Sequence, residues 1–345
     1  MLFQQILLKI LTSFQNERTI SAAYHLLKGK RSGQTIQDVG LFKLYQFFGL
    51  LPKLTRPKFD EQIDILFAKN TIVIEENGYF QMTAEGKKLA EEPLPFAFDS
   101  WHYRGNEHLF FARLSLVSQS LSHQTNGVRA FIPIERNETV QHWVRNFLVK
   151  NHFQQQKLQQ VLYEEMEQSL QNLKVEEKIK DLLIYRLTGY EQPGYTWQQL
   201  AFGYHMQEMD VQLLYISGLH QWLMEIENND GYPILQQLAE GIRVEAILTD
   251  SANTTAKLYN KGYSLEQISL MRKLKTSTIE DHLVELAMND THFSIEQFVS
   301  KEEQQQVIQT VEAYDTKRLR TLHEILPQIS YFQLRLALAK GVENV

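Results

Sequence analysis

The stretch GYSLEQISLMRKLKTSTIEDHL, residues 262–283, has the pattern of two helices joined by a tight turn. Gly262 is placed to end a preceding helix, because glycine readily adopts the left-handed conformation that follows a helix C-terminus. Ser264, with Gln267 three residues later, predicts a capping box at the start of the next helix. With the apolar Leu274 in the turn, the pattern is that of a DNA-binding helix-turn-helix. A bihelical corner with a purely structural role is the alternative.

The apolar residues of both helices indicate which sides face inward. We expect the helix after the turn to begin at Thr276 or Ser277, with Ser277 and Glu280 forming a second capping box. The inward residues are then Leu265, Ile268 and Leu270 before the turn, and Ile279, Leu283 and Leu286 after it. Of these, Ile268, Ile279 and Leu283 should be buried together with Leu274 of the turn.

The polar residues around the turn divide into two groups. The candidate DNA-contacting residues are Arg272, Lys273, Lys275, Ser277 and Thr278. Backbone N–H groups at the helix N-terminus add donors for phosphate. The outer side of the same helix carries the candidate partner-binding residues Glu280, Asp281 and Glu285, which repel phosphates although one could accept from a cytosine amine. Phosphate contact at the turn, or a protein interface, is therefore favoured over sequence-specific base readout.

Residues 20–92 have the element order of a winged helix. Three helices are expected over 20–30, 35–51 and 55–70, followed by a β-hairpin with Asn77-Gly78 at its turn. Residues 79–89 resemble the last wing strand and closing helix of many winged-helix proteins. Winged helices bind DNA or dock proteins, so both roles remain open, as does a small α+β module without a DNA role.

The N-terminal region is locally basic. Residues 17–58 contain eight Lys and Arg residues against two acidic ones, a local charge of +6, although the whole chain has a formal net charge of −6. The candidate DNA-contacting residues here are Lys30, Arg31, Lys53, Arg56 and Lys58. The interleaved aromatic residues are interpreted as core, so the cations carry the DNA hypothesis for this region.

Residues 93–248 predict a helical middle region that contains a second bihelical pattern. Residues 194–200 (GYTWQQL) match residues 262–268 (GYSLEQI). The match is either a weak internal repeat or the same capping box used independently at the start of two short helices. The carboxylates Glu164, Glu165 and Glu167 are expected on a solvated face. Five aromatic residues are either partner-binding anchors or core: Tyr195, Trp197, Tyr204, Tyr215 and Trp222.

Composition sets the limits for these hypotheses. The chain has 345 residues, of which 43% are hydrophobic, mostly at helical spacing, which fits two or three mainly helical domains. Cysteine is absent, which excludes disulfides and thiolate metal sites and fits a reducing cytosol. No run is long enough to span a bilayer, and the N-terminus lacks the features of a signal peptide. The negative net charge argues against strong non-specific binding to nucleic acid, but a local basic patch can still bind it.

Motifs for catalysis are missing from the sequence. The P-loop pattern does not occur, and Gly29-Lys30-Arg31 is the nearest fragment of it. Neither a dinucleotide-binding glycine motif nor a serine nucleophile elbow is present. Asp99, His102 and His108 are close in sequence, but we interpret them as polar residues of a loop and helix start. We therefore expect a non-enzymatic protein with no catalytic residues, metal or cofactor.

Residues 250–341, including the late stretch LPQISYFQLRLAL, resemble the helix-turn-helix domain at the C-terminus of some RecQ-type DNA helicases. The full domain order is similar to that of the YpbB family of Firmicute proteins. This resemblance implies a stand-alone protein that is associated with a RecQ-like helicase lacking this module.

Together these observations predict a mainly α fold in three parts. These are a winged-helix-like domain (1–92), a helical middle region (93–248) and a RecQ-C-terminal-like helix-turn-helix domain (249–345). The function expected is that of a non-catalytic accessory protein that partners a RecQ-like helicase and contacts DNA in repair or recombination, with modest, salt-sensitive affinity. A sequence-specific transcription regulator is the alternative. We expect a cytoplasmic protein, with association with the nucleoid as an option, and leave its oligomeric state open.

Overall fold

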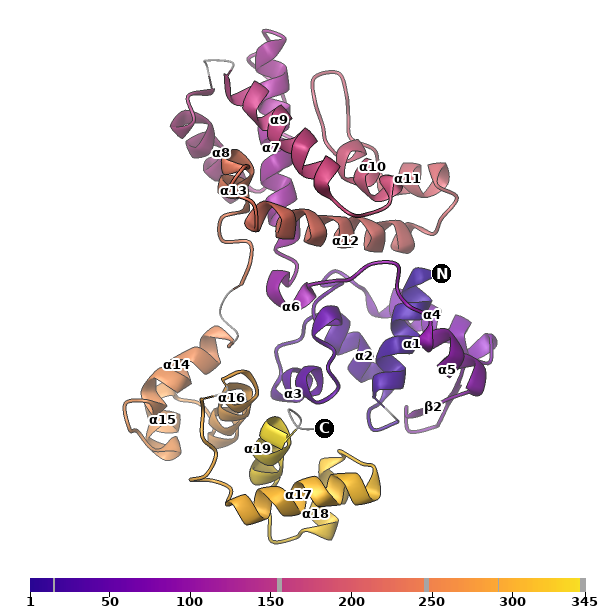
Figure 1. Cartoon of the computed structure of the whole chain (residues 1–345), viewed down its shortest axis with the longest axis vertical. Coiled ribbons are helices and arrows are strands. Elements are labelled where there is room, and N and C mark those ends of the chain that lie inside the picture. Colours follow the sequence, from indigo (N-terminus) through magenta and orange to yellow (C-terminus); the bar gives the residue numbers. More distant parts are fainter. Residues whose placement is uncertain (15, 154–156, 245–247, 291, 342–345) are drawn as a thin grey trace. The chain divides into compact units, whose positions relative to one another are not determined.

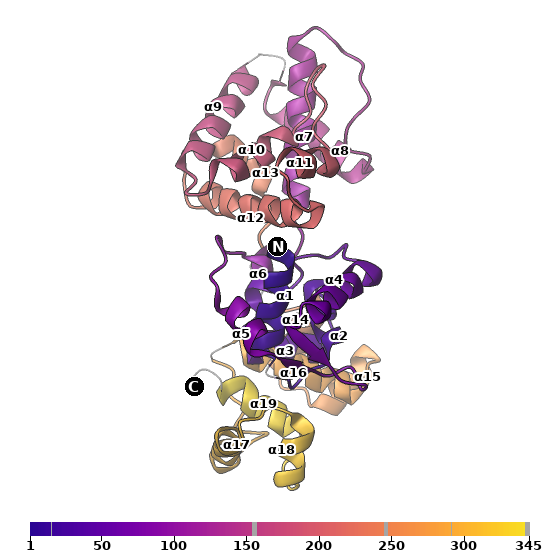
Figure 2. The same ribbon diagram turned by 90° about the vertical axis from the view of Figure 1, so that its right-hand side faces the viewer.

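The computed structural model describes residues 1–14, 16–153, 157–244, 248–290 and 292–341. These residues form a mainly helical protein with one two-stranded β-sheet in the described part, as predicted (Figures 1 and 2). No described helix is long and apolar enough to cross a membrane. The chain divides into two compact units, the first formed by Met1–Ile6 and Glu92–Val244 and the second by Leu7–Glu91 and Glu245–Val345. The division into three independent domains stays a prediction.

The N-terminal part of the second unit follows the winged-helix order. Its elements are α1 (Leu2–Ser13, which begins in the first unit), α2 (Ile20–Leu27), α3 (Gly33–Leu41), a 3-10 turn (Tyr45–Phe47), α4 (Arg56–Ala68), β1 (Ile72–Ile74), β2 (Phe80–Met82) and α5 (Ala84–Glu91). The expected helix over 35–51 is shorter than predicted, because the chain turns at Lys43, which has a φ of +53°. Gly78, with a φ of +80°, makes the hairpin turn that the sequence predicted.

In the described residues, helices are the regular secondary structure of the C-terminal part of the second unit. It consists of α14 (Asp250–Tyr259), α15 (Leu265–Arg272), α16 (Thr276–Asn289), α17 (Lys301–Tyr314), α18 (Leu319–Ile325) and α19 (Tyr331–Gly341). α16 is fully buried at Ile279, Leu283 and Val284, where it packs against α14, α15 and α19 of this part and against α3 of the N-terminal part. α16 therefore joins the two parts of this unit.

The first unit is built around one long helix, α12 (Glu208–Glu227). The other helices are α6 (Ser100–Tyr103), α7 (Glu107–Thr125), α8 (Glu138–Lys150), α9 (Lys157–Asn172), α10 (Glu177–Tyr185), α11 (Trp197–Gly203) and α13 (Pro233–Ala239). Trp222 of α12 is fully buried and donates to the Ser169 hydroxyl at 2.9 Å. The expectation of a solvated face is wrong for Glu165, because its buried carboxylate accepts hydrogen bonds from the backbone N–H groups of Ile234 and Leu235 at the start of α13.

Candidate nucleic-acid interface

α15 begins with the capping box that the sequence predicted. The Ser264 hydroxyl accepts from the Gln267 N–H at 3.3 Å, and the Gln267 side chain accepts from the Ser264 N–H at 2.9 Å. Lys273 then takes a left-handed conformation, with a φ of +53°, and α16 begins at Thr276. The second capping box was wrong, because Lys275 is the N-cap residue and Ser277 already lies inside the first helical turn.

Most of the predicted core of this corner is confirmed. Ile268, Ile279 and Leu283 are fully buried, whereas Leu274 of the turn is only partly buried. Leu270 does not face inward as predicted, since 79% of it is exposed. The reason is helical geometry, because a residue two positions after Ile268 lies roughly 200° around the helix from it. Leu270 instead lies on the surface beside the exposed Met271.

The outer side of α16 packs against another helix of the same unit. Helical periodicity places Asp281, Val284 and Met288 on the side of α16 opposite Ile279 and Leu283. Along this side runs α3, which lies beside α16 in both views (Figures 1 and 2). A Cβ atom added at Gly33 of α3 would lie 2.5 Å from the carboxylate carbon of Asp281.

A second close approach between α3 and α16 lies about two helical turns further along. A Cβ atom added at Gly40 of α3 would lie 1.9 Å from the terminal methyl carbon of Met288. Arg335 of α19 closes the contact, because its guanidinium pairs with Asp281 at 2.6 Å and donates to the Gln37 side chain at 2.9 Å. Past its first turn, the helix that would enter a DNA groove in a helix-turn-helix protein is therefore covered on its outer side.

The three predicted partner-binding carboxylates lie in different environments. Glu285 is buried, so its expected place on an exposed acidic face is wrong: its carboxylate accepts from the backbone N–H and the hydroxyl of Thr249 and so caps α14. Asp281 is partly exposed and paired with Arg335. Glu280 is partly exposed, and burial, opposed by Arg335, raises the pKa of its carboxyl. A partner-binding role for these residues stays a prediction.

The predicted DNA-contacting residues at the turn are also not equivalent. Arg272 points inward: its guanidinium donates to the carbonyl and hydroxyl of Ser251 at 2.7 and 2.9 Å and to the Thr255 hydroxyl, which ties α15 to α14. Lys273, Lys275 and Ser277 are exposed, and Thr278 is partly exposed. Neither lysine forms an ion pair with a described residue. The open part of the turn is thus two lysines and the first turn of α16.

The predicted DNA-contacting residues of the N-terminal region are all on the surface. Lys30, Arg31, Lys53, Arg56 and Lys58 are each exposed. Arg56 pairs with Asp60 at 2.7 Å, within the first turns of α4. Further along, the exposed side of α4 carries Glu61 and Asp64, so the cluster of cations lies at the N-terminal end of this helix and is followed by acidic side chains.

Comparison with known proteins identifies the C-terminal domain and the family of the whole chain. Residues 251–338 match the family model of a helix-turn-helix domain. Protein YpbB of Bacillus subtilis (strain 168) is 32% identical to this chain over 349 residues, which cover 99% of this chain and 98% of that protein. The chain belongs to the YpbB family. No solved structure matches it significantly. The helix-turn-helix domain suggests DNA binding, and this domain and the mainly helical fold suggest a non-enzymatic protein.

Within this YpbB-family chain, the covering of α16 depends on residues that the sequence analysis did not select. Gly33 and Gly40 are seven residues apart, so they lie on the same side of α3. Glycine is costly inside a helix, and two glycines on one side indicate that another helix approaches closely there. The spacing of these two glycines was therefore the sequence signal for a close helix contact on this side of α3. Arg335 gave no comparable signal, because its partners lie far away in the sequence.

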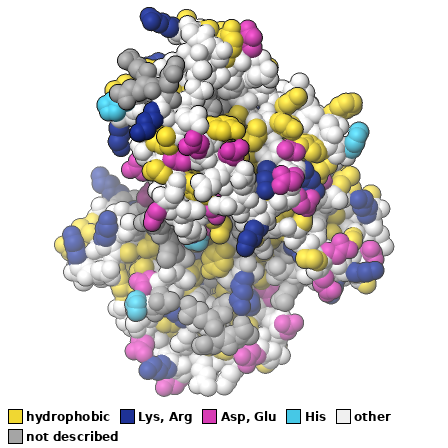
Figure 3. All heavy atoms as spheres, turned by 45° about the horizontal axis from the view of Figure 1, so that its top comes forward, with side chains coloured by type: hydrophobic (Ala, Val, Ile, Leu, Met, Phe, Trp, Pro, Cys, Tyr) yellow, Lys and Arg dark blue, Asp and Glu magenta, His cyan; other side chains and the backbone are white. Residues whose placement is uncertain are grey.

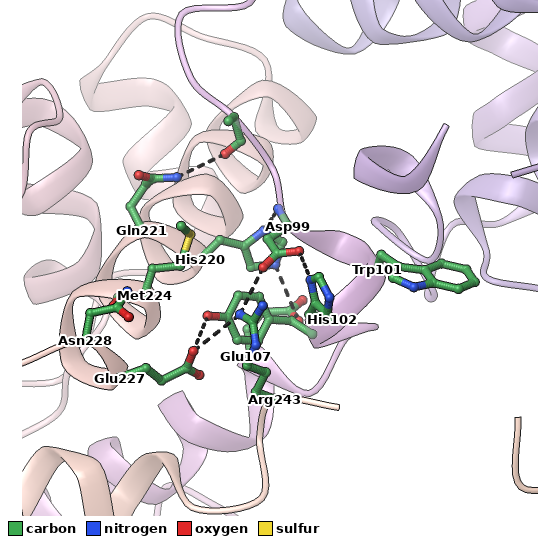
Figure 4. A network of polar contacts seen from close by, with 12 residues as sticks. Asp99, Trp101, His102, Glu107, His220, Gln221, Met224, Glu227, Asn228 and Arg243 are labelled. Atoms are coloured by element: carbon green, nitrogen blue, oxygen red, sulfur yellow. Dashed lines mark hydrogen bonds and ion pairs between the residues drawn. The ribbon is translucent and has the colours of Figure 1, made fainter. Parts of the chain in front are cut away.

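The polar residues considered for a metal site belong to a network in the first unit (Figure 4). Asp99 pairs with His102 at 2.5 Å and with Arg243 at 3.1 Å, and Arg243 also pairs with Glu227 of α12 at 3.3 Å. His220 lies beside Glu107 at 3.7 Å, with both side chains buried. No group of three or more metal-ligating side chains is placed to hold an ion among the residues that the structure describes. The network ties α6, α7 and α12 to residues 240–244.

The aromatic residues of the middle region divide between core and surface. Tyr215 and Trp222 are buried, so they are core, whereas Tyr195 is 49% exposed. Trp197 and Tyr204 are partly exposed. Hydrophobic side chains form separate patches among charges of both signs on the face shown in Figure 3. Tyr195 therefore remains the most accessible of the five predicted anchors.

Proposed function

We propose that this chain is a non-catalytic accessory protein that partners a RecQ-like DNA helicase and contacts DNA during repair or recombination, in the cytoplasm at the nucleoid. The DNA part rests on the helix-turn-helix domain of residues 251–338. The partner part rests on the resemblance of residues 250–341 to a module that some RecQ-type helicases carry covalently. A separate copy serves a helicase only when it is held there, because tethering supplies effective concentration.

The covered side of α16 is the observation that favours this proposal over a sequence-specific transcription regulator. A regulator of the helix-turn-helix type inserts its second helix into the major groove and reads base edges with its outer residues, starting from the N-terminal end of the helix. In this chain α3 packs against that side at Asp281 and Met288, and Val284 is 1% exposed. The exposed polar groups of the corner include the lysines of the turn and Ser277, which suit phosphates. A protein that contacts DNA without reading bases fits a helicase accessory role.

Mixing the purified protein with the RecQ-like helicase of the same cell tests the proposal. Size-exclusion chromatography with and without a forked duplex should show co-elution, and the unwinding rate of the fork should change. A selection from a random duplex library runs in parallel and should enrich no sequence. Absence of co-elution in both conditions together with an unchanged unwinding rate contradicts the proposal, and enrichment of one short duplex sequence favours the transcription regulator.

A further inference from the structure

The cations of the N-terminal region come together because two turns are packed against each other. Gly29 comes just after α2 and has a φ of +68°. It lies so close to Gly49 that a Cβ atom added at Gly29 would be 2.9 Å from the Gly49 Cα atom. The Gly49 N–H donates to the Leu26 carbonyl at 2.9 Å, and the Leu51 N–H donates to the Leu27 carbonyl at 2.9 Å. The end of α2 is thereby fixed beside the segment that leads into α4.

Side chains complete this arrangement. Arg56 at the start of α4 donates to the Ser21 hydroxyl of α2 at 3.1 Å, and Tyr24 of α2 donates to the Leu54 carbonyl at 3.4 Å. We call the resulting cluster of cations the α2–α4 basic surface; it consists of Lys28, Lys30, Arg31, Lys53, Arg56 and Lys58. The cluster therefore combines two segments that are about 25 residues apart in the chain.

The positive charge of this surface is largely uncompensated. Within the described ranges, Lys30, Arg31, Lys53 and Lys58 form no ion pair, and Arg56 alone has a carboxylate partner, Asp60. Burial, followed by the charges of the nearby Lys30 and Arg56, lowers the pKa of His25. Like charges held together repel one another, so such a surface is suited to a polyanion.

The aromatic residue of this surface is not available to a base. Tyr24 is partly buried, its hydroxyl is hydrogen-bonded, and the cationic groups of Lys28 and Arg56 lie over its ring at 5.8 and 5.5 Å from the centroid. Proteins that bind single-stranded nucleic acid combine a positively charged groove with open aromatic rings on which the bases stack. Cations without an open ring instead suit a duplex, whose phosphates are regularly spaced and whose bases are already stacked.

We propose that the α2–α4 basic surface binds the phosphate backbone of duplex DNA and is the principal DNA contact of this chain. The inference rests on the proposed function in one respect, that the chain contacts DNA, and it adds where the contact lies and what is recognised. The turn between α15 and α16 exposes two lysines, whereas the basic surface exposes five cations besides the partly buried Lys28. More neutralised phosphates give a larger release of counterions and hence tighter binding.

The test uses the full chain and a 20-base-pair duplex of random sequence, with binding measured by fluorescence anisotropy at several salt concentrations. One variant combines Lys30→Gln, Arg31→Gln, Lys53→Gln and Lys58→Gln. A control variant combines Lys87→Gln, Lys88→Gln, Lys150→Gln and Lys174→Gln, which removes the same number of exposed charges elsewhere. Thermal unfolding followed by circular dichroism checks that both variants are folded.

We expect the first variant to lose at least about tenfold in affinity and to reduce the slope of log K against log[salt] by about 3 to 4, while the control matches the wild type. Equal affinities of the two variants would overturn the inference, even if the wild type binds DNA well. Tighter binding of a single-stranded 20-mer that depends on the same four residues would also contradict it. If the wild type binds no DNA at any salt concentration, the DNA part of the proposed function fails as well.

Discussion

The turn between α15 and α16 and the α2–α4 basic surface belong to the same compact unit, but they expose different groups. The turn has the backbone geometry of a DNA-binding motif, yet Arg272 is bonded to α14 and the outer side of α16 is packed against α3. The α2–α4 basic surface lies at the start of α4, whose later charged residues are acidic, and its cations are exposed apart from the partly buried Lys28. Helix geometry therefore identifies the type of domain, whereas exposure and charge are the basis on which we propose the face that contacts DNA.

The largest effect that we expect concerns the core of the helix-turn-helix. Leu283→Asp places an unpaired carboxylate at a fully buried position and should lower the free energy of unfolding by about 4 kcal/mol or more. Leu270→Asp is the matched control, because Leu270 is 79% exposed. Urea unfolding followed by circular dichroism measures both. Equal losses for the two variants would contradict the assignment of the inner and outer sides of this corner.

The next effect concerns the packing of α3 on α16. Gly40→Leu would insert a side chain where Met288 lies, and overpacking of this kind costs about 1 to 3 kcal/mol. Gly203→Leu in α11 is the control, because a Cβ atom there meets no heavy atom within 4 Å. Thermal unfolding should separate the two variants. Full stability of Gly40→Leu would show that α3 does not pack tightly on α16 in solution.

A smaller effect is expected for the ion pair that closes this contact. Arg335→Gln removes the pair with Asp281 and the bond to Gln37, which are partly buried, and should cost about 1 kcal/mol. Arg320→Gln removes a pair with Glu324 in which both side chains are mostly exposed, so its stability should stay close to that of the wild type. A double-mutant cycle of Arg335→Gln with Asp281→Asn isolates the pair, and a coupling energy near zero would contradict its role.

The smallest effect is a dependence on pH. Burial, followed by the charge of Arg272 and opposed by Asp281, lowers the pKa of His282 below its ordinary value of 6.5. The unfolded chain then binds this proton at a higher pH than the folded chain, so stability is lost as the pH falls below about 6.5. Unfolding between pH 7.5 and 5 should show a weaker loss for His282→Gln. An identical pH dependence for both proteins would exclude His282 as a contributor.

Local features of this unit could be predicted from the sequence, because they depend on neighbouring residues. The capping box of Ser264 and Gln267 and the hairpin turn at Gly78 are of this kind. The two glycines of α3 could indicate a close approach, but not that α16 is the helix that approaches, since Gly40 meets Met288 across some 250 residues of chain. The burial of Glu285 was missed for a related reason: its partner Thr249 lies before α14, outside the pattern of α16 itself.

Cysteine labelling tests most directly whether the outer side of α16 stays covered. The chain contains no cysteine, so Val284→Cys and Ser277→Cys each introduce a single thiol, the first at a position 1% exposed and the second on the open first turn. We expect the Ser277→Cys thiol to react rapidly with a maleimide, and the Val284→Cys thiol to react only at the rate of unfolding, both with and without duplex DNA. Rapid reaction of the Val284→Cys thiol in the folded protein, or its appearance on addition of DNA, would contradict the claim that α3 keeps this helix from reading bases.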